Sequence, residues 1–487
     1  MSGVPLIRTI RSNLAPIRHD GDYVLYWMIA FRRTRWNFAL DRAIEWAREL
    51  KKPLLVMEAL GCDYPWASER LHRFVMDGMA EKARALRDAS VFYFPYLEMR
   101  RGEGHGLLEK LGEGACVIVT DDFPCFFLPR MVRSAAVGLR ARLEAVDSNG
   151  LMPLGATPEA FSTAHAFRRF LQKNLPTHLA DFPNANPLRG LVLPRLRALP
   201  PEITQRWPVA TVPRLDGTAT LNSLPIDHVV GAAVMKGGED MARVTLRRFL
   251  SEHLEKYAED RNQPDEDCSS GLSPYLHFGQ IASHEVFSEL MKREEWSERK
   301  LALRVSGSRE GWWGVAKPAE AFLDQFVTWR ELGFNFAHHR SDYDRYESLP
   351  EWAQRTLAKH ARDQREHTYT AEEFAQARTH DPIWNAAQRQ LLREGRMHNY
   401  LRMLWGKKIL EWTHAPIEAA EIMIELNNRY AVDGRDPNSY SGIFWCLGRY
   451  DRPWGPERPV FGTLRYMSSA NTTRKPGLKN YLQKYGG

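Results

Sequence analysis

The chain has 487 residues, of which 44% are hydrophobic and 26% are charged, a balance typical of soluble globular proteins. A chain of this length is expected to form two or three domains. No uninterrupted apolar run approaches the length of a membrane span, and residues 1–13 lack the apolar core of a secretion signal. The formal charge of +7 suits an anionic partner such as nucleic acid.

The five cysteines are scattered along the chain without the spacing typical of zinc or redox sites. An odd number of well-separated cysteines indicates a reducing compartment and no disulfide framework. We therefore expect a cytoplasmic protein, associated with the nucleoid if the cell is bacterial, with no metal site.

Apolar runs of strand length alternate with helical patterns in the first 180 residues. This alternation predicts an α/β domain over 1–180, a doubly wound parallel sheet covered on both faces. A dinucleotide-binding domain is the alternative, but residues 32–37 occupy the turn where a Gly-x-Gly-x-x-Gly fingerprint would stand. The expected strands are 23–31, 53–57, 91–94, 116–120 and 144–146, and the expected helices are 37–50, 68–89, 106–111 and 127–143.

Proline marks the next region. Eight prolines and little periodicity over residues 181–236 predict a long, extended interdomain linker. From residue 237 onward the periodicity is helical, so an all-α domain is expected over 237–487, with its first helix at 239–259.

Five tryptophans lie between residues 384 and 454, interleaved with Arg, Asn and Asp. Trp405 and Trp412 are seven residues apart, which predicts one shared helix face, and Trp384 lies one short helix earlier. An aromatic-rich core explains this spacing as well as an electron relay does.

Polar residues accompany these indoles. Arg402 and Asp433 are candidates for a buried ion pair, which destabilises a fold unless something requires it. Asn427 lies on an apolar run, so its amide is expected to be buried and to need a hydrogen-bond partner.

Four long runs of the C-terminal half resemble the flavin-binding half of class II DNA photolyases, the cyclobutane pyrimidine dimer repair enzymes of the photolyase/cryptochrome family. The resemblance covers residues 237–470 closely and 20–180 loosely. It implies a deoxyribodipyrimidine photolyase that uses reduced FAD, acts on double-stranded DNA containing pyrimidine dimers, and is expected to be a monomer. The runs are His-Asp-Pro-x-Trp-Asn from residue 380, Met-His-x-Tyr-x-Arg-Met from 397, Lys-Lys-Ile-Leu-Glu-Trp from 407 and Asp-Gly-Arg-Asp-Pro-Asn-x-Tyr from 433.

The resemblance also implies a cofactor site. Taken alone, the Ser-rich loop 269–279 is either a helix cap or an anion site; the resemblance implies that it holds the FAD diphosphate. It further implies that Asn427 faces flavin N5 and that Trp384, Trp405 and Trp412 pass electrons to the flavin in an order left open. The cofactor residues that it implies are Tyr257, Ser270, Leu272, Ser273, Asn399, Arg402, Asp433 and Asn427.

Gln325 and Trp329 are four residues apart and share a helix face, where an amide and an indole suit a planar base or form an ordinary surface pair. The resemblance assigns both to the DNA lesion, with Gln325 where repair-competent class II enzymes have a glutamate. A Gln amide donates a hydrogen bond at any pH, so recognition is retained while a proton role is lost. The other substrate residues that it implies are Trp445, Asp451, Arg452 and Arg465.

Three functions follow from this pattern. Repair of cyclobutane dimers is favoured because Trp329, Trp445 and Arg452 are all present; a cryptochrome-like photoreceptor without repair and a photolyase with another lesion preference are the alternatives. Whether the N-terminal domain binds a deazaflavin or folate antenna stays open, since residues 120–124 and 146–149 depart from the usual class II sequence.

Overall fold

The computed structural model of the chain describes residues 3–474 and 477–487. The chain divides into two compact units, each built from three segments of the sequence. Each unit combines separate stretches of the sequence, so this division does not test the domain limits expected at 180 and 236, which stay predictions. Unit 1 comprises Met1–Pro158, Thr177–Thr245 and Leu272–Glu289, and unit 2 comprises Glu159–Pro176, Leu246–Gly271 and Leu290–Gly487.

Unit 1 contains a sheet of six strands: β1 (Thr9–Arg11), β2 (Tyr23–Met28), β3 (Leu54–Leu60), β4 (Val91–Leu97), β5 (Ala115–Asp121) and β6 (Arg142–Val146). Their order is β1-β6-β5-β2-β3-β4, with β1 antiparallel to β6 and the other neighbours parallel. Every residue of β2 and β5 is buried, as expected for central parallel strands. The α/β prediction is therefore confirmed.

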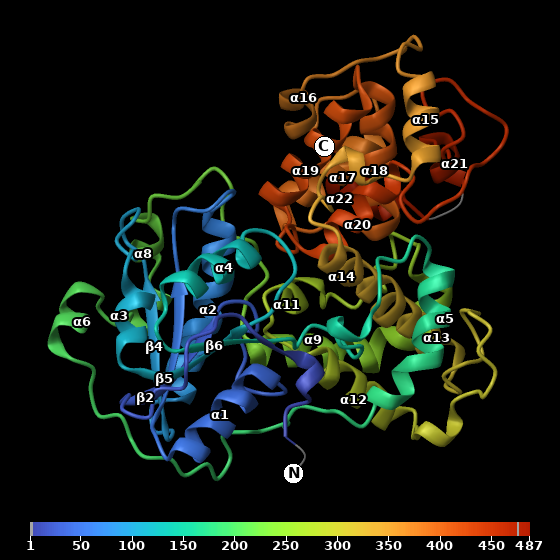
Figure 1. Cartoon of the computed structure of the whole chain (residues 1–487). Helices are drawn as coiled ribbons and strands as arrows, with labels where there is room; N and C mark the ends of the chain where they lie inside the picture. Colours follow the sequence, from blue (N-terminus) through green and yellow to red (C-terminus); the bar gives the residue numbers. More distant parts are fainter. Residues whose placement is uncertain (1–2, 475–476) are drawn as a thin grey trace. The chain divides into compact units, whose positions relative to one another are not determined.

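Helices alternate with these strands: α1 (Phe38–Leu50), α2 (Glu69–Ala85), α3 (Leu107–Glu113) and α4 (Leu128–Gly138). Figure 1 shows them around the sheet, in blue to cyan. Asn37 caps α1, because its side-chain oxygen accepts the amides of Ala39 and Leu40 at 3.0 and 3.4 Å. The helix expected over 127–143 ends at Gly138, since residues 142–146 join the sheet as β6.

The turn after β2 is filled by a side chain of the protein itself. The Asp121 carboxylate at the end of β5 accepts the backbone amides of Ile29, Ala30 and Phe31 at 2.9, 2.7 and 2.8 Å. Successive amides of this kind form the nest that binds phosphate in nucleotide-binding folds. Because Asp121 takes that place, the turn leaves no nest for a dinucleotide.

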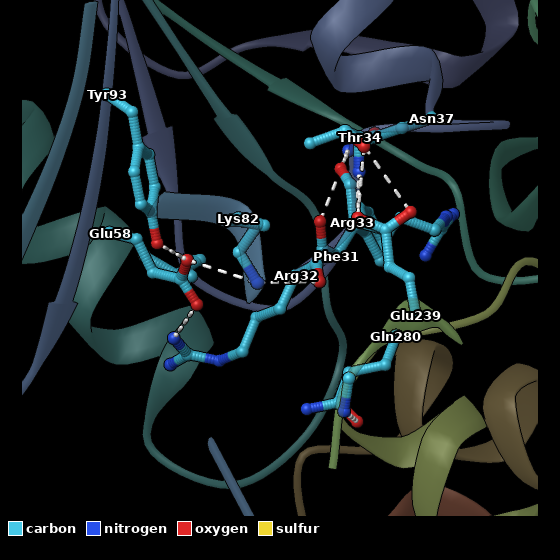
Figure 2. Close-up of polar contacts among 12 residues, drawn as sticks. Phe31, Arg32, Arg33, Thr34, Asn37, Glu58, Lys82, Tyr93, Glu239 and Gln280 are labelled. Atoms are coloured by element: carbon cyan, nitrogen blue, oxygen red, sulfur yellow. Dashed lines mark hydrogen bonds and ion pairs between the residues drawn. The ribbon is translucent and has the colours of Figure 1, made fainter. Parts of the chain in front are cut away.

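A buried ionic cluster anchors the same turn (Figure 2). Glu58 is fully buried; it accepts a hydrogen bond from Arg32 at 2.9 Å and another from the Tyr93 hydroxyl, and it lies 3.3 Å from the Lys82 ammonium. Burial opposes ionisation, but Lys82 and Arg32 hold the pKa of Glu58 below its usual value. The turn is therefore fixed by two cations around one carboxylate.

The proline-rich stretch carries three short helices, α6 (Pro201–Arg206), α7 (Val212–Asp216) and α8 (Thr218–Asn222). Ala210, Leu215, Leu221 and Leu224 are buried in one cluster with residues of α2. The stretch is therefore part of unit 1 and packs on α2, which its irregular spacing of apolar residues did not predict.

Unit 2 is helical, and its described residues contain no strand, which confirms the all-α prediction. The helices α14, α17, α18, α19 and α20 pack against one another (Figure 1, brown to red). Its helices are α5 (Ala164–Asn174), α10 (Tyr257–Asp260), α13 (Lys317–Leu323), α14 (Arg330–His339), α15 (Glu351–Lys359), α16 (Ala371–Ala375), α17 (Pro382–Glu394), α18 (Asn399–Trp412), α19 (Pro416–Tyr430), α20 (Pro437–Cys446), α21 (Ser469–Arg474) and α22 (Lys479–Tyr485).

Two of the boundaries between the units fall within α9 (Glu239–Arg248) and α12 (Ser283–Arg293), and α11 (Ser273–His277) belongs to unit 1. The single helix expected over 239–259 is instead α9, a π-helical turn η4 (Phe249–His253), a 3-10 turn η5 (Leu254–Lys256) and α10. The π turn buries Phe249. No helix among the described residues is long and apolar enough to cross a membrane.

Candidate active site

Three indoles form one connected group inside unit 2. Trp384 of α17 is fully buried, and its ring is parallel to that of Trp405, with centroids 6.4 Å apart. The Trp412 ring lies 6.1 Å from that of Trp384, at an interplanar angle of 66°. Trp384 Nε1 donates to the Trp405 backbone oxygen at 3.0 Å, and Trp405 Nε1 donates to Gln388 at 2.9 Å, so both buried polar edges are satisfied. Trp384 is therefore the middle member of the group.

Arg402 and Asp433 form the expected ion pair, with Nη2 and Oδ1 3.4 Å apart. Their side chains are 22% and 11% exposed, so the pair lies at the edge of the core and not fully inside it. Asn427 is buried, and its amide nitrogen donates to the Ser439 hydroxyl at 2.6 Å. The hydroxyl supplies the partner that burial of this amide requires.

A buried histidine four residues before Arg402 has ring nitrogens that need hydrogen-bond partners. His398 precedes α18 and is 5% exposed, and neither ring nitrogen has a hydrogen-bond partner among the described residues. Burial lowers the pKa of this imidazole to about 4, so the ring is neutral and retains one N–H to donate. The following residue, Asn399, is exposed. An orphaned buried donor beside an exposed amide fits a polar cofactor such as FAD.

The predicted diphosphate loop crosses the division between the units, with Ser270 in unit 2 and Leu272 and Ser273 in unit 1. Gly271 between them has a φ of +67°, a conformation that favours glycine. Tyr257, predicted to lie beside the cofactor, packs edge-on against the Phe249 ring at 5.6 Å. Burial raises the pKa of its phenol to about 12. The role of these four residues in cofactor binding stays a prediction.

Gln325 and Trp329 lie in a π-helical turn, η7 (Asp324–Trp329), that leads into α14. Both side chains are half-buried. Single π turns inserted in α-helices are frequent at functional sites. The turn is anchored by Asp324, which accepts the Nε and Nη2 groups of Arg168 at 2.9 and 2.7 Å in a buried pair.

Three of the predicted substrate residues form a second contact group near the end of α20. The Arg465 guanidinium lies 5.6 Å from the ring centroid of Trp445 and 4.1 Å from that of Trp454. Asp451 accepts Arg465 Nε and Trp454 Nε1, both at 3.0 Å. Another predicted substrate residue, Arg452, is exposed and lies 5.0 Å from the ring centroid of Trp454.

Tyr450 directly precedes Asp451 in the chain and contacts the π turn, and sequence reasoning missed it. Its ring lies edge-on to Trp329 at 6.5 Å, and its hydroxyl is 3.2 Å from that of Ser441. Its φ is +64°, an outlier for a bulky residue and of the kind that clusters at functional sites. The polar run at 449–452 was the available signal, but a backbone conformation is not visible in residue types.

No family model matches the chain, but individual proteins do. It is 37% identical over 468 residues to the deoxyribodipyrimidine photo-lyase of Methanothermobacter thermautotrophicus, covering 96% of this chain and 95% of that protein. It is 31% identical over 475 residues to the Arabidopsis thaliana protein of the same name, covering 94% and 88%. The chain belongs to the deoxyribodipyrimidine photo-lyase family.

Solved structures agree on the fold of this photo-lyase. A class III photolyase from Agrobacterium tumefaciens matches with a TM-score of 0.66 at 16% identity, covering 96% of this chain and 86% of that one. A Synechocystis cryptochrome matches with a TM-score of 0.65 at 15% identity, covering 100% and 89%. At such identities the likeness concerns the fold alone. The predicted family and enzyme class are confirmed, and the roles of single residues stay predictions.

Proposed function

We propose that the chain repairs cyclobutane pyrimidine dimers in double-stranded DNA, using light and FAD in its reduced form. The observation that carries this proposal is the 37% identity over 96% of the chain to a deoxyribodipyrimidine photo-lyase. The presence of Trp329, Trp445 and Arg452 supports a substrate site, for which a photoreceptor without repair activity has little use. The formal charge of +7 supports a DNA partner.

FAD is the cofactor that the site residues fit. When bound and excited in its reduced form, it supplies the electron that opens the cyclobutane ring and takes it back afterwards. The neutral Asn427 amide offers no acidic proton to the flavin edge, and the Ser hydroxyls suit a diphosphate. We assign FAD to Tyr257, Ser270, Leu272, Ser273, Asn399, Arg402, Asp433 and Asn427.

The substrate residues would receive a dimer flipped out of the helix. Flipping a damaged pair costs less than flipping a stacked normal one, which favours the lesion. Trp329 and Trp445 would pack on its bases, and the Gln325 amide would donate to a pyrimidine carbonyl. We assign Asp451 and Arg452 to the lesion side and Arg465 to phosphate contact.

We infer the relay order Trp412, Trp384, Trp405 for electrons that reduce the cofactor. The middle position of Trp384 follows from its contacts with both other rings. Trp405 lies three residues after Arg402 on α18, whereas Trp412 is the last residue of that helix, so we assign Trp405 to the cofactor end.

A deazaflavin or folate antenna has one supported position, in unit 1. Trp66 and Phe126 stack with centroids 5.9 Å apart, and Phe127 lies 4.7 Å from Phe126. Both stacked residues have positive φ, +64° and +62°, which marks strained segments. They follow β3 and β5, at the carboxyl edge of the sheet where α/β folds bind ligands. An absorption band other than that of flavin in the purified protein would support the antenna.

We also propose that the enzyme acts as a monomer in the cytoplasm. The five cysteines are scattered along the sequence and buried, and this spacing suits a reducing compartment. A single species of about one chain mass in light scattering would support the monomer, and a stable dimer would contradict it.

The test of the proposed function compares two lesions. Reduced protein is incubated with oligonucleotides that carry either a thymine cyclobutane dimer or a pyrimidine–pyrimidone photoproduct, in the dark and under blue light. Light-dependent loss of the cyclobutane dimer alone is expected. Repair of the other photoproduct alone would establish a different lesion preference. Normal flavin photoreduction with repair of neither would favour the photoreceptor.

A further inference from the structure

Lys407 is a buried cation that none of the roles above involves. It lies on α18, is 1% exposed, and donates from Nζ to the backbone oxygen of Cys446 at 2.7 Å. Cys446 is the last residue of α20, where backbone carbonyls lack partners within the helix. A cation at a helix C-terminus is also favoured by the helix dipole. This contact alone would make Lys407 a cap of α20.

The same ammonium also faces a predicted substrate residue. It lies 5.5 Å from the ring centroid of Trp445, within the range of a cation–π interaction. Arg465 lies at a similar 5.6 Å, but its charge is paired with Asp451 at 3.0 Å. Lys407 forms no ion pair in the described part of the chain, because its hydrogen bond is to a neutral carbonyl. It therefore brings an unpaired positive charge to Trp445.

The charge of Lys407 is the one in this cluster that changes near neutral pH. The groups that face it are the Cys446 thiol, the Asp451 carboxylate and the Arg465 guanidinium. Burial lowers the pKa of the Lys407 ammonium to about 8; Cys446 and Asp451 oppose this shift and Arg465 adds to it. Burial raises the pKa of the Cys446 thiol to about 11, so this group stays neutral while Lys407 titrates.

We propose that Lys407 is a positioning residue of the substrate site, which fixes Trp445 and places a positive charge behind the base that packs on this indole. The inference rests on the proposed repair function. Between the arrival of one electron and its return, the pyrimidine pair is anionic and the two bonds that join its bases break, so no further reactant is needed. A preorganised buried cation stabilises this anionic state more than the neutral dimer. Lys407 thereby raises the fraction of absorbed photons that end in ring opening.

Two variants separate the electrostatic role from the cap. Lys407→Arg keeps a charge at every accessible pH, whereas Lys407→Met removes it at similar volume. Lys484→Met, on the exposed face of α22, controls for the loss of a lysine elsewhere. The measured quantities are the dimer yield per absorbed photon and the Kd for dimer-containing DNA, both across a pH range centred on about 8.

The repair yield of the wild type is expected to fall several-fold as pH rises through this range. The yield of Lys407→Arg should not change with pH, and the yield of Lys407→Met should be low at every pH. The Kd is expected to change less than the yield in every case. Lys407→Met with a wild-type yield and pH profile would overturn the proposal. So would a wild-type decline that Lys407→Arg shares, since another group would then titrate.

A second measurement does not depend on repair. The fluorescence difference between the protein and its Trp445→Phe variant is titrated over the same pH range, with and without Lys407→Met. A change near pH 8 that disappears in Lys407→Met is expected from the ammonium–indole contact. If this change is present but the wild type repairs no dimer in light, the proposed function fails and the contact stands. If repair is light-dependent but the titration is absent, the inference fails alone.

Discussion

Trp384 is the residue on which the proposed relay depends, since its ring contacts both Trp405 and Trp412. A benzene ring at this position is harder to oxidise than an indole and lacks the N–H that bonds the Trp405 carbonyl. The rate of light-driven flavin reduction is therefore expected to fall by more than an order of magnitude in Trp384→Phe. This rate is measured from the flavin absorbance under blue light. Repair by protein reduced chemically beforehand is expected to persist.

The matched control is Trp27→Phe, in the buried strand β2 of unit 1, which should photoreduce normally. Photoreduction of Trp384→Phe at the wild-type rate would show that electrons reach the cofactor by another route.

Gln325 gives a prediction with a pH dependence. An amide donates to a pyrimidine carbonyl at any pH, whereas a carboxyl group donates only while it is protonated. The repair yield of Gln325→Glu should therefore fall as pH rises through the pKa of the introduced carboxyl group. This pKa is about 4.3 in water and is raised by burial. The wild type should show no such decline in this pH range. Equal profiles for both proteins below neutral pH would contradict a hydrogen-bonding role for this side chain.

The π turn η7 illustrates how an element is held in place. Arg168 of α5 pairs with Asp324, the first residue of the turn, and the two side chains are 8% and 7% exposed. Arg168→Met would leave the Asp324 carboxylate buried without its partner, and is expected to destabilise the fold by about 3–5 kcal/mol in urea unfolding. Lys173→Met, exposed on the same helix α5, should change stability by less than about 0.5 kcal/mol. A loss below about 1 kcal/mol for Arg168→Met would mean that the pair contributes little.

The loop after α20 is tied to α15 by a histidine between two carboxylates. His360 Nδ1 lies 2.6 Å from Asp363, and Nε2 lies 2.8 Å from Glu457 in the loop. Hydrogen bonds to Glu457 and Asp363 raise the pKa of this imidazole. A raised folded-state pKa means that the stabilisation is fully present below the unfolded pKa of about 6.5 and is lost as pH rises through the folded value.

Amide hydrogen exchange in residues 451–463, corrected for intrinsic rates, should therefore accelerate as pH rises through that window. His360→Gln should exchange rapidly throughout and show no such step. A step of the same size in this variant would assign the effect to another group.

The helices and strands that the sequence predicted are those with long, regular patterns of apolar residues. The central strands are continuous apolar runs, and burial on both faces requires such runs. The strand β1 was missed because it has three residues, two of them exposed, at the edge of the sheet. The π turn η7 was missed because Gln325 and Trp329, four residues apart, would share a face in an α-helix and nearly share one in a π turn. Their spacing therefore does not distinguish the two conformations.

The whole molecule brings together site residues that lie far apart in the sequence, and only part of that was predictable. The indole group and the Arg402–Asp433 pair follow from helix spacing and a family resemblance. Tyr450 and Lys407 do not, because a positive φ and a lysine that turns inward leave no signal in residue types. A lysine is exposed in most proteins, so its burial is seen only in the structure.

Light-driven repair by reduced FAD can be followed in a single turnover. Chemically reduced protein is mixed in the dark with an equal amount of an oligonucleotide that carries one thymine cyclobutane dimer, and thymine absorbance is followed before and during blue light. We expect no change in the dark, and recovery of absorbance in light without net consumption of reductant. Dimer loss in the dark, or none in light while reduced FAD is bound, would contradict it.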